Sequence, residues 1–345
     1  SRSNMETSLF LGVVYLESTN ASYAGGRMRV VVTGGAGFVG SHIVEMLIGR
    51  SDDVLVVDDL STGKRSNLSP NVRMEEMAIG DEGLAPVFAD WRPDAVVNAA
   101  AQASVPSSIS NPEHDAKVNI VDGIAVMNAA VAAGVSKFVY INTGGALYGE
   151  PDYLPCDEDH PIRPISPYGL SKWTLEACLV MLLPPSVSLL TLRLANVYGP
   201  RQDPHGEAGV VAIFALRMLA GGEITIFGDG DQTRDFVYID DLVRAIRLAV
   251  SANGVGGEIF QIAANAETTV AGVANKLLPI LASFGVSEAH VRHSPARAGD
   301  ARRHFSDASK AWDRLGWQAE TVLADGLRQT VEWFMSRERA VAAAE

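Results

Sequence analysis

Residues 29–40 read RVVVTGGAGFVG, and this stretch decides the fold. Its consecutive valines predict a buried strand, and the spacing of Gly34, Gly37 and Gly40 predicts a tight turn that opens directly into a helix. Gly34 permits the turn, Gly37 lets the backbone approach a pyrophosphate, and Gly40 lets the helix pack closely on the strand. Because a helix N-terminus favours an anion, the stretch predicts a dinucleotide-binding turn rather than a plain glycine-rich loop.

Asp58 supports this interpretation, because it lies 18 residues past Gly40, at the end of the next predicted strand, 54–57. A carboxylate at that place can bind the adenosine ribose diol and repel a 2′-phosphate. The turn and the carboxylate together predict NAD as the cofactor in preference to NADP.

Strands and helices alternate along the next hundred residues. Short apolar runs at 95–98, 138–142 and 189–194 predict buried strands, and the apolar face at 120–131 predicts a helix between two of them. Strands separated by helices form parallel sheets. We therefore expect an α/β fold, a Rossmann-type doubly wound parallel sheet with a smaller C-terminal α/β lobe.

The domain organisation follows from where this rhythm breaks, near residue 196. We expect an NAD-binding domain over 28–195, a substrate lobe formed mainly by 196–338 and interleaved with the sheet, and a tail over 339–345. The apolar run at 9–16 resembles a short signal sequence, but we interpret residues 1–27 as an upstream extension or leader. No run reaches the roughly 18 apolar residues of a membrane span.

Tyr168 and Lys172 form the second chemical signal, because residues four apart lie side by side on one helix face. A free tyrosine has a pKa near 10, but an adjacent ammonium and a cationic nicotinamide favour the phenolate. Tyr168 is thus a candidate general base. The pair is common on helix surfaces, and the upstream dinucleotide turn is what favours the catalytic interpretation.

The composition excludes several classes of protein. The chain has 345 residues, 41 acidic against 28 basic, with a formal charge of −13, so it offers no basic stripe for nucleic acid. The two cysteines and seven histidines show no metal-ligand spacing beyond His290 and His293, which lie in an irregular stretch, so we expect no metal site and no disulfide scaffold. We expect a cytoplasmic protein that binds neither nucleic acid nor a membrane.

With these residues in place, the chain resembles the extended short-chain dehydrogenase/reductase family and, within it, the UDP-galactose 4-epimerase group. The resemblance extends from Met28 to about Phe334. Beyond the glycine turn and the Tyr-Lys pair, the similar segments stand in the family's order, at 58–64, 99–105, 143–149, 196–201, 228–230, 234–237 and 297–300.

The resemblance implies a set of cofactor-binding residues in the loops that follow the first strands. They are Gly34, Gly37, Phe38, Val39, Gly40, Asp58, Asp59, Leu60, Ser61, Gly63, Lys64, Ala99, Ala100, Ala101 and Asn119, together with Tyr168 and Lys172.

It also implies a site for a nucleotide sugar. Asn196, Arg234 and Arg297 would hold the diphosphate, since an arginine fork suits phosphate oxygens, and Asp300 would accept from the ribose hydroxyls. The remaining implied substrate-binding residues are Ser104, Gly144, Gly145, Arg201, Val210 and Phe227.

The loop at 143–149 departs from many relatives, which carry serine or threonine where this chain has Gly144. We assign the hydrogen bond to the sugar's O4 to Thr143, one residue earlier. Sugar 4,6-dehydratases and UDP-glucuronate decarboxylases place an acid within this loop for proton transfer at C5 or C6. Gly144, Gly145 and Ala146 offer none, so the resemblance implies an isomerase.

The implied reaction is an NAD-dependent inversion at C4 of a UDP-sugar through a 4-keto intermediate. UDP-glucose/UDP-galactose and UDP-glucuronate/UDP-galacturonate both stay open, because Arg201 or Ser104, Ser107 and Ser108 could meet a carboxylate. His304 stands where relatives wall the C2 side of the sugar, which disfavours an N-acetyl group. The alternatives are another nucleotide-sugar epimerase or reductase of the same family, or a non-catalytic NAD-sensing protein.

The resemblance also implies a homodimer. Helices expected near 113–133 and 167–183 carry more apolar surface than one sheet face needs. In the family the equivalent pair forms a four-helix bundle between two subunits.

Overall fold

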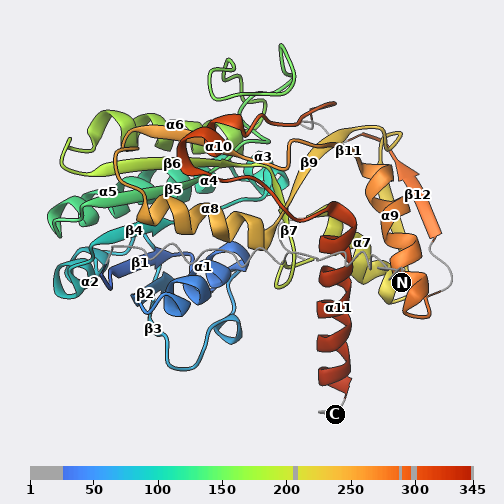
Figure 1. Cartoon of the computed structure of the whole chain (residues 1–345), viewed down its shortest axis with the longest axis horizontal. Helices are drawn as coiled ribbons and strands as arrows, with labels where there is room; N and C mark the ends of the chain where they lie inside the picture. Colours follow the sequence, from blue (N-terminus) through green and yellow to red (C-terminus); the bar gives the residue numbers. More distant parts are fainter. Residues whose placement is uncertain (1–25, 205–208, 287–289, 297–300, 343–345) are drawn as a thin grey trace, which may run out of the picture.

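The computed structural model describes residues 26–204, 209–286, 290–296 and 301–342, without the side chains beyond residue 337. The interpretation of residues 1–27 as a leader therefore falls almost wholly outside the described residues. A wide sheet with helices on both faces makes up one lobe, and a smaller group of helices and short strands makes up the other (Figure 1).

Seven parallel strands form the central sheet, in the order β10-β6-β5-β4-β1-β2-β3. The predicted Rossmann-type sheet is confirmed. Its strands are β1 (Arg29–Thr33), β2 (Asp53–Asp58), β3 (Arg73–Glu76), β4 (Ala95–Asn98), β5 (Lys137–Thr143), β6 (Ser188–Leu194) and β10 (Glu258–Ile262).

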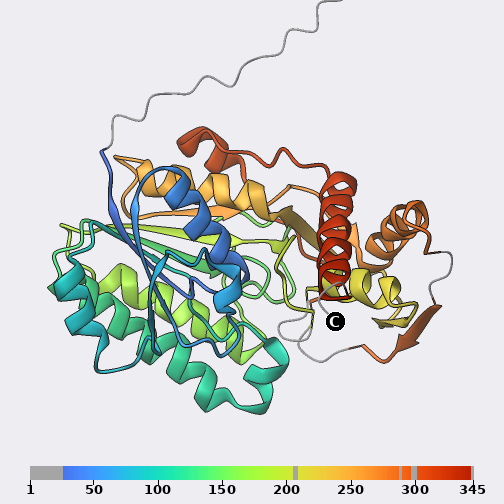
Figure 2. The ribbon, with the colours of Figure 1, turned by 90° about the horizontal axis from the view of Figure 1, so that it is seen from below.

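Helices cover both faces of this sheet, as Figure 2 shows from below. One face carries α1 (Phe38–Gly49) and α8 (Ile239–Ser251). The other carries α2 (Leu84–Trp91), α5 (Gly123–Ala132) and α6 (Pro167–Leu182). Within β1, Val30 and Val32 join the core under the first pair, whereas Val31 joins the core under the second set. This alternation is why the strand is apolar throughout.

Short helical segments fill the loops that follow the strands. They are a 3₁₀ turn, η1 (Arg65–Asn67), the helices α3 (Val105–Ser110) and α4 (Pro112–Ala116), and a π-helical segment, η2 (Lys117–Asp122), that runs into α5.

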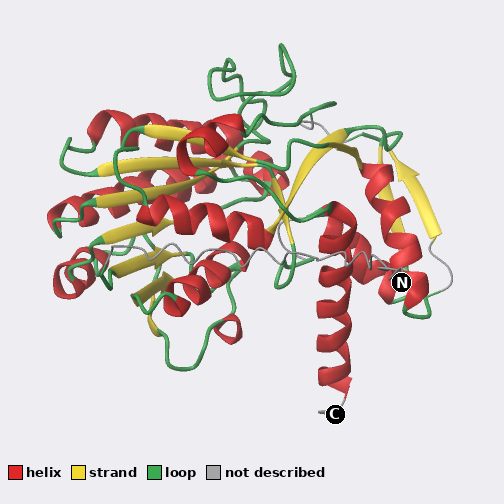
Figure 3. Ribbon diagram, in the orientation of Figure 1, coloured by secondary structure: helices red, strands yellow, loops and turns green. Residues whose placement is uncertain are grey.

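The smaller lobe contains two short sheets and three packed helices, drawn at the right of Figure 3. Its three-stranded sheet has the order β11-β9-β7 and its two-stranded sheet pairs β12 with β8. The elements of this lobe are β7 (Asn196–Tyr198), α7 (Val210–Leu219), β8 (Glu223–Phe227), β9 (Thr233–Tyr238), β11 (Glu267–Thr269), α9 (Val270–Ser283), β12 (His290–Ser294) and α11 (Leu323–Ala342). The short helix α10 (Ser309–Leu315) packs instead against β10 and α8 of the large lobe.

Candidate active site

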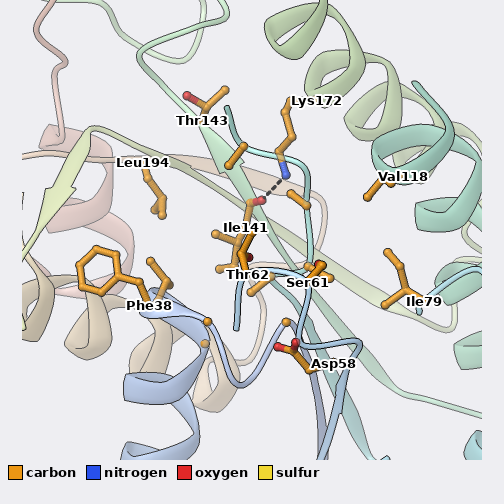
Figure 4. A pocket seen from close by; sticks show the side chains of 18 of the residues that line it. Phe38, Asp58, Ser61, Thr62, Ile79, Val118, Ile141, Thr143, Lys172 and Leu194 are labelled. Atoms are coloured by element: carbon orange, nitrogen blue, oxygen red, sulfur yellow. Dashed lines mark hydrogen bonds between the residues drawn. The ribbon is translucent and has the colours of Figure 1, made fainter. Parts of the chain in front are cut away.

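A cavity of about 320 Å³ lies at the carboxyl ends of β1, β2, β4 and β5 (Figure 4). This edge of a parallel α/β sheet is where ligands bind. Most of the predicted cofactor residues line the cavity: Gly34, Gly37, Phe38, Val39, Gly40, Asp58, Asp59, Ser61, Ala99, Ala100 and Ala101, with Thr143, Tyr168 and Lys172.

The glycine turn leaves backbone exposed to this cavity. Gly34 has φ +66°, and a Cβ there would stand 2.8 Å from the backbone of Ala100. A Cβ on Gly40 would overlap the carbonyl oxygen of Gly34, so the start of α1 could not pack against the turn. Gly34 is therefore needed both for its backbone conformation and for the close approach of Ala100, whereas Gly40 is needed for space alone.

Asp58 is buried at the end of β2 and holds two loops together. Its carboxylate accepts from the backbone N–H of Ala36 at 2.8 Å and from that of Leu60 at 2.9 Å. Burial raises the pKa of this carboxyl, and these hydrogen bonds oppose the rise. The residue thus fixes the glycine turn relative to the next loop while its side chain borders the cavity.

Four predicted cofactor residues do not border the cavity in this structure. Leu60 and Gly63 belong to the loop behind Asp58, and Lys64 pairs with Asp203 at 3.6 Å. Asn119 is buried, where its side-chain amide bonds the backbone of Gln102 and the hydroxyl of Ser171. Asn119 therefore supports the loop after β4 from behind.

Ile79 and Val118 were not predicted from sequence but line the same cavity, as Figure 4 shows. Ile79 follows β3, whose sequence, Arg-Met-Glu-Glu, carries no apolar run. A strand that short and charged gives no periodic signal, and the residues after it are missed for the same reason.

The Tyr-Lys pair lies on the first turns of α6, which begins at Pro167 after an N-cap at Ser166. Ser166 accepts from the backbone N–H of Gly169 at 3.1 Å, and this satisfies one of the free donors of the helix. Lys172 is buried, and its ammonium donates to the carbonyl of Ile141 at 2.8 Å (Figure 4). Thr143 ends β5 at the cavity wall beside this helix.

A second cavity, of about 430 Å³, opens on the smaller lobe. It contains four predicted substrate residues, Asn196, Val210, Phe227 and Arg234, together with Arg217, Thr225 and Arg292. At the junction of β6 and β7, Leu194, Ala195 and Val197 line the first cavity, whereas Asn196 lines the second. The backbone segment 194–197 is therefore a wall that the two cavities share.

The other predicted substrate residues are dispersed. Arg297 and Asp300 fall outside the described residues. Ser104 is the N-cap of α3, where its hydroxyl accepts from the N–H of Ser107 at 3.2 Å. Arg201 pairs with Glu45 of α1 at 2.5 Å and borders a different pocket.

Gly144 packs against Gln261 of β10. A Cβ on Gly144 would stand 2.9 Å from the side-chain oxygen of Gln261, whereas a Cβ on Gly145 would have 3.5 Å to its nearest neighbour, Asn196. A side chain at position 144 would therefore require Gln261 to move. Thr143 is the hydroxyl that the end of β5 offers to the cavity.

His304 is 1% exposed and stacks on Tyr148, with ring centroids 5.9 Å apart and ring planes 9° from parallel. Burial lowers its pKa to about 4, and the nearby Arg234 and His160 act in the same direction. The ring is therefore neutral at physiological pH and lies behind the loop at 143–149.

Among the described residues, no three His, Cys, Asp or Glu side chains gather as a metal ion would need. Within the same part of the chain, no helix has the length and apolar composition to cross a bilayer.

Comparison with known proteins identifies the family. Residues 30–263 match the NAD dependent epimerase/dehydratase family. UDP-glucose 4-epimerase of Mycolicibacterium smegmatis is 40% identical over 316 residues, covering 90% of this chain and 99% of that protein. The crystal structure of UDP-glucose 4-epimerase from Thermotoga maritima with UDP-glucose is 44% identical, with a TM-score of 0.86 over 90% of this chain and 100% of that one. The Thermus thermophilus enzyme complexed with NAD is 39% identical, with a TM-score of 0.83 over 89% and 99%. This chain belongs to the NAD dependent epimerase/dehydratase family.

Proposed function

We propose that this protein interconverts UDP-glucose and UDP-galactose by inverting C4, with NAD as its bound cofactor. One observation carries the proposal: Tyr168, Lys172 and Thr143 meet in the cavity beneath the glycine turn, and that cavity shares a wall with the one containing Asn196 and Arg234. A sugar held by its diphosphate in the second cavity would present its ring to the first.

The residues present fit NAD. Gly34, Gly37 and Gly40 bring the backbone of the glycine turn to the cavity wall, and Asp58 borders the cavity as a carboxylate. When bound, NAD supplies a hydride acceptor for C4 and later the hydride donor. Gly37 and the start of α1 would hold the pyrophosphate, and Asp58 would hold the adenosine ribose.

The chain's own residues would move the proton. Tyr168, as the phenolate, takes the proton of the 4-hydroxyl group and returns it to O4 at the end of the reaction. Lys172 lies one turn further along α6 and favours the phenolate through its charge. Thr143 donates a hydrogen bond to O4. The 4-keto sugar turns about its diphosphate anchor, and its other face is then reduced.

The acid that dehydration or decarboxylation needs is not found among the described lining residues. Asp58 and Asp59 are the carboxylates of the first cavity, and both lie at the end of β2. Asp59 there accepts from Ser61. Gly144, Gly145 and Ala146 leave the loop after β5 without a proton donor for C5 or C6, which supports simple inversion at C4.

A neutral hexose is favoured over a uronate because three of the four groups considered for a carboxylate have partners elsewhere. Arg201 is paired with Glu45, Ser104 caps α3, and the hydroxyl of Ser108 donates to the carbonyl of Val105 at 2.7 Å. The similarity to proteins named UDP-glucose 4-epimerase supports the same choice.

The test is incubation of the purified protein separately with UDP-glucose and UDP-glucuronate, followed by anion-exchange chromatography that resolves epimers. We expect a UDP-galactose peak and an unchanged UDP-glucuronate peak. Tyr168→Phe is the control, and it should lower the rate by about 10²–10⁴-fold while bound NAD is retained. A UDP-galacturonate peak alone would shift the substrate to the uronate. No product from either, with NAD bound, would contradict the proposal.

The proposal includes a homodimer formed by α5 and α6. On α6, Leu170, Trp173, Ala177 and Val180 are exposed at helical spacing, on the side away from Lys172. Next to α6, Val121 of η2 and Val131 of α5 are exposed as well. Two such helices from each subunit would bury these stripes in a four-helix bundle.

We also assign the enzyme to the cytoplasm. Cys156 and Cys178 are both free, and a reducing compartment would keep them so.

A further inference from the structure

A buried polar network lies behind the loop at 143–149, and neither the sequence pattern nor the proposed reaction accounts for it. Its centre is the ion pair between Glu176 of α6 and Arg193 of β6, whose side chains are 5% and 3% exposed. Neither residue lines the cofactor cavity. Burying two charges is costly unless each is paired and fully hydrogen-bonded, so the network calls for an explanation.

On one side the pair joins β5 to the helix that carries Tyr168. Glu176 lies one turn beyond Lys172 and accepts from the side-chain amide of Asn142 at 2.6 Å. The oxygen of that same amide accepts from the backbone N–H of Thr143 at 2.8 Å. A continuous chain of hydrogen bonds therefore runs from α6 to the backbone of Thr143.

On the other side the pair reaches the end of the same loop. Arg193 donates to the hydroxyl of Tyr148 at 3.0 Å and to the carbonyl of Glu158 at 3.2 Å. Gln261 of β10 also donates to the Tyr148 hydroxyl and packs its oxygen against Gly144. Burial raises the pKa of Tyr148 to about 12, so the phenol stays protonated at neutral pH. Its oxygen accepts both hydrogen bonds through its lone pairs.

We propose that Glu176 and Arg193 are positioning residues that fix Thr143 and the loop at 144–149 relative to Tyr168 and Lys172. The inference rests on the proposed function for its effect on turnover. The pair holds both ends of the loop, through Asn142 at its start and Tyr148 near its end. Because general acid–base catalysis and O4 binding depend on geometry, loosening this loop lowers kcat and leaves nucleotide binding intact.

The test compares the wild-type holoenzyme with Glu176→Met/Arg193→Met. Removing one partner alone would strand a buried charge, whereas an apolar pair of similar volume often preserves the fold. The double variant keeps the packing and loses the bonds to Asn142 and Tyr148. We expect it to retain NAD, to keep KM for UDP-glucose within twofold, and to lose at least tenfold in kcat.

Lys137→Met is the matched control. Lys137 lies at the opposite end of β5, is 7% exposed, and donates to the carbonyls of Val250 and Ala252. The variant also removes a buried cation from the same sheet, but far from the loop. We expect a lower melting temperature with unchanged kcat. A double variant that folds, binds NAD and turns over at the wild-type rate would overturn the proposal.

Hydrogen–deuterium exchange provides a readout that does not depend on turnover. In the double variant we expect faster exchange at the amides of residues 143–149, with exchange in the glycine turn and α1 unchanged. Unchanged exchange in this loop, or an increase spread over the whole sheet, would contradict a positioning role. If the wild type epimerises no substrate, the proposed function fails, and the exchange pattern still decides what the network does.

Discussion

At Gly144, a single absent side chain determines how the catalytic loop packs. The space that its Cβ would occupy lies 2.9 Å from the side-chain oxygen of Gln261, and that same Gln261 donates to Tyr148. Any residue larger than glycine would press on the buried network. A serine or threonine at position 144 is therefore incompatible with the present position of Gln261.

We predict that Gly144→Ser destabilises the protein by about 1–3 kcal/mol, the usual cost of overpacking a tight site. Gly145→Ser is the matched control, because its new Cβ would lie 3.5 Å from the nearest atom and would fit without moving a neighbouring residue. Thermal unfolding of the two holoenzymes measures the difference. Equal melting temperatures for the two variants would mean that Gln261 yields easily.

Among the elements, those defined by local sequence could be predicted and those defined by distant partners could not. The glycine turn, Asp58 and the Tyr168–Lys172 pair each depend on residues within about one strand and one helix. The strands β3 and β10, which form the two edges of the sheet, are not predicted from the sequence. β3 is charged, and β10 reaches its place beside β6 after more than sixty intervening residues.

The same distinction applies to the candidate site. Glu176, Arg193 and Gln261 meet from three elements, and no spacing along the chain connects them. Arg201 shows the reverse case, since its motif suggested the sugar site and the structure pairs it with Glu45 on α1. Arg201 has a φ of +67°, a conformation that is uncommon for a residue other than glycine. The sequence motif around Arg201 does not encode the direction in which its side chain then points.

The N-cap of α6 stabilises the turn that carries Tyr168. Ser166 caps this helix two residues before Tyr168, so Ser166→Ala should cost about 1 kcal/mol and loosen the turn that presents the phenol. We expect kcat to fall several-fold, measured by the epimer assay.

Thr269→Ala is the comparison, because Thr269 caps α9 in the same way, through the N–H of Gly272 at 2.9 Å. Its loss should lower the melting temperature by a similar amount and leave kcat unchanged. Equal effects on kcat would show that stability, and not the position of Tyr168, limits the reaction.

For the whole molecule, the exposed stripe on α6 sets the expected assembly. Val180→Asp would place a charge at the centre of the proposed four-helix bundle, where desolvating it is unfavourable. We predict a shift from dimer to monomer, measured by light scattering on a size-exclusion column. Val322→Asp is the control, because Val322 is 65% exposed, close to the 60% of Val180, but lies in the loop before α11. A monomeric wild type would contradict the dimer.

The position of β10 at the edge of the large sheet also bears on how the protein is made. As the nascent chain leaves the ribosome, the first six strands appear by residue 194, yet β6 has no neighbour on its outer side until residues 258–262 emerge. In that interval an unpaired strand edge is open to other chains. Synthesis of the smaller lobe is thus a period of exposure to aggregation, and a chain terminated between the lobes would keep that edge uncovered permanently.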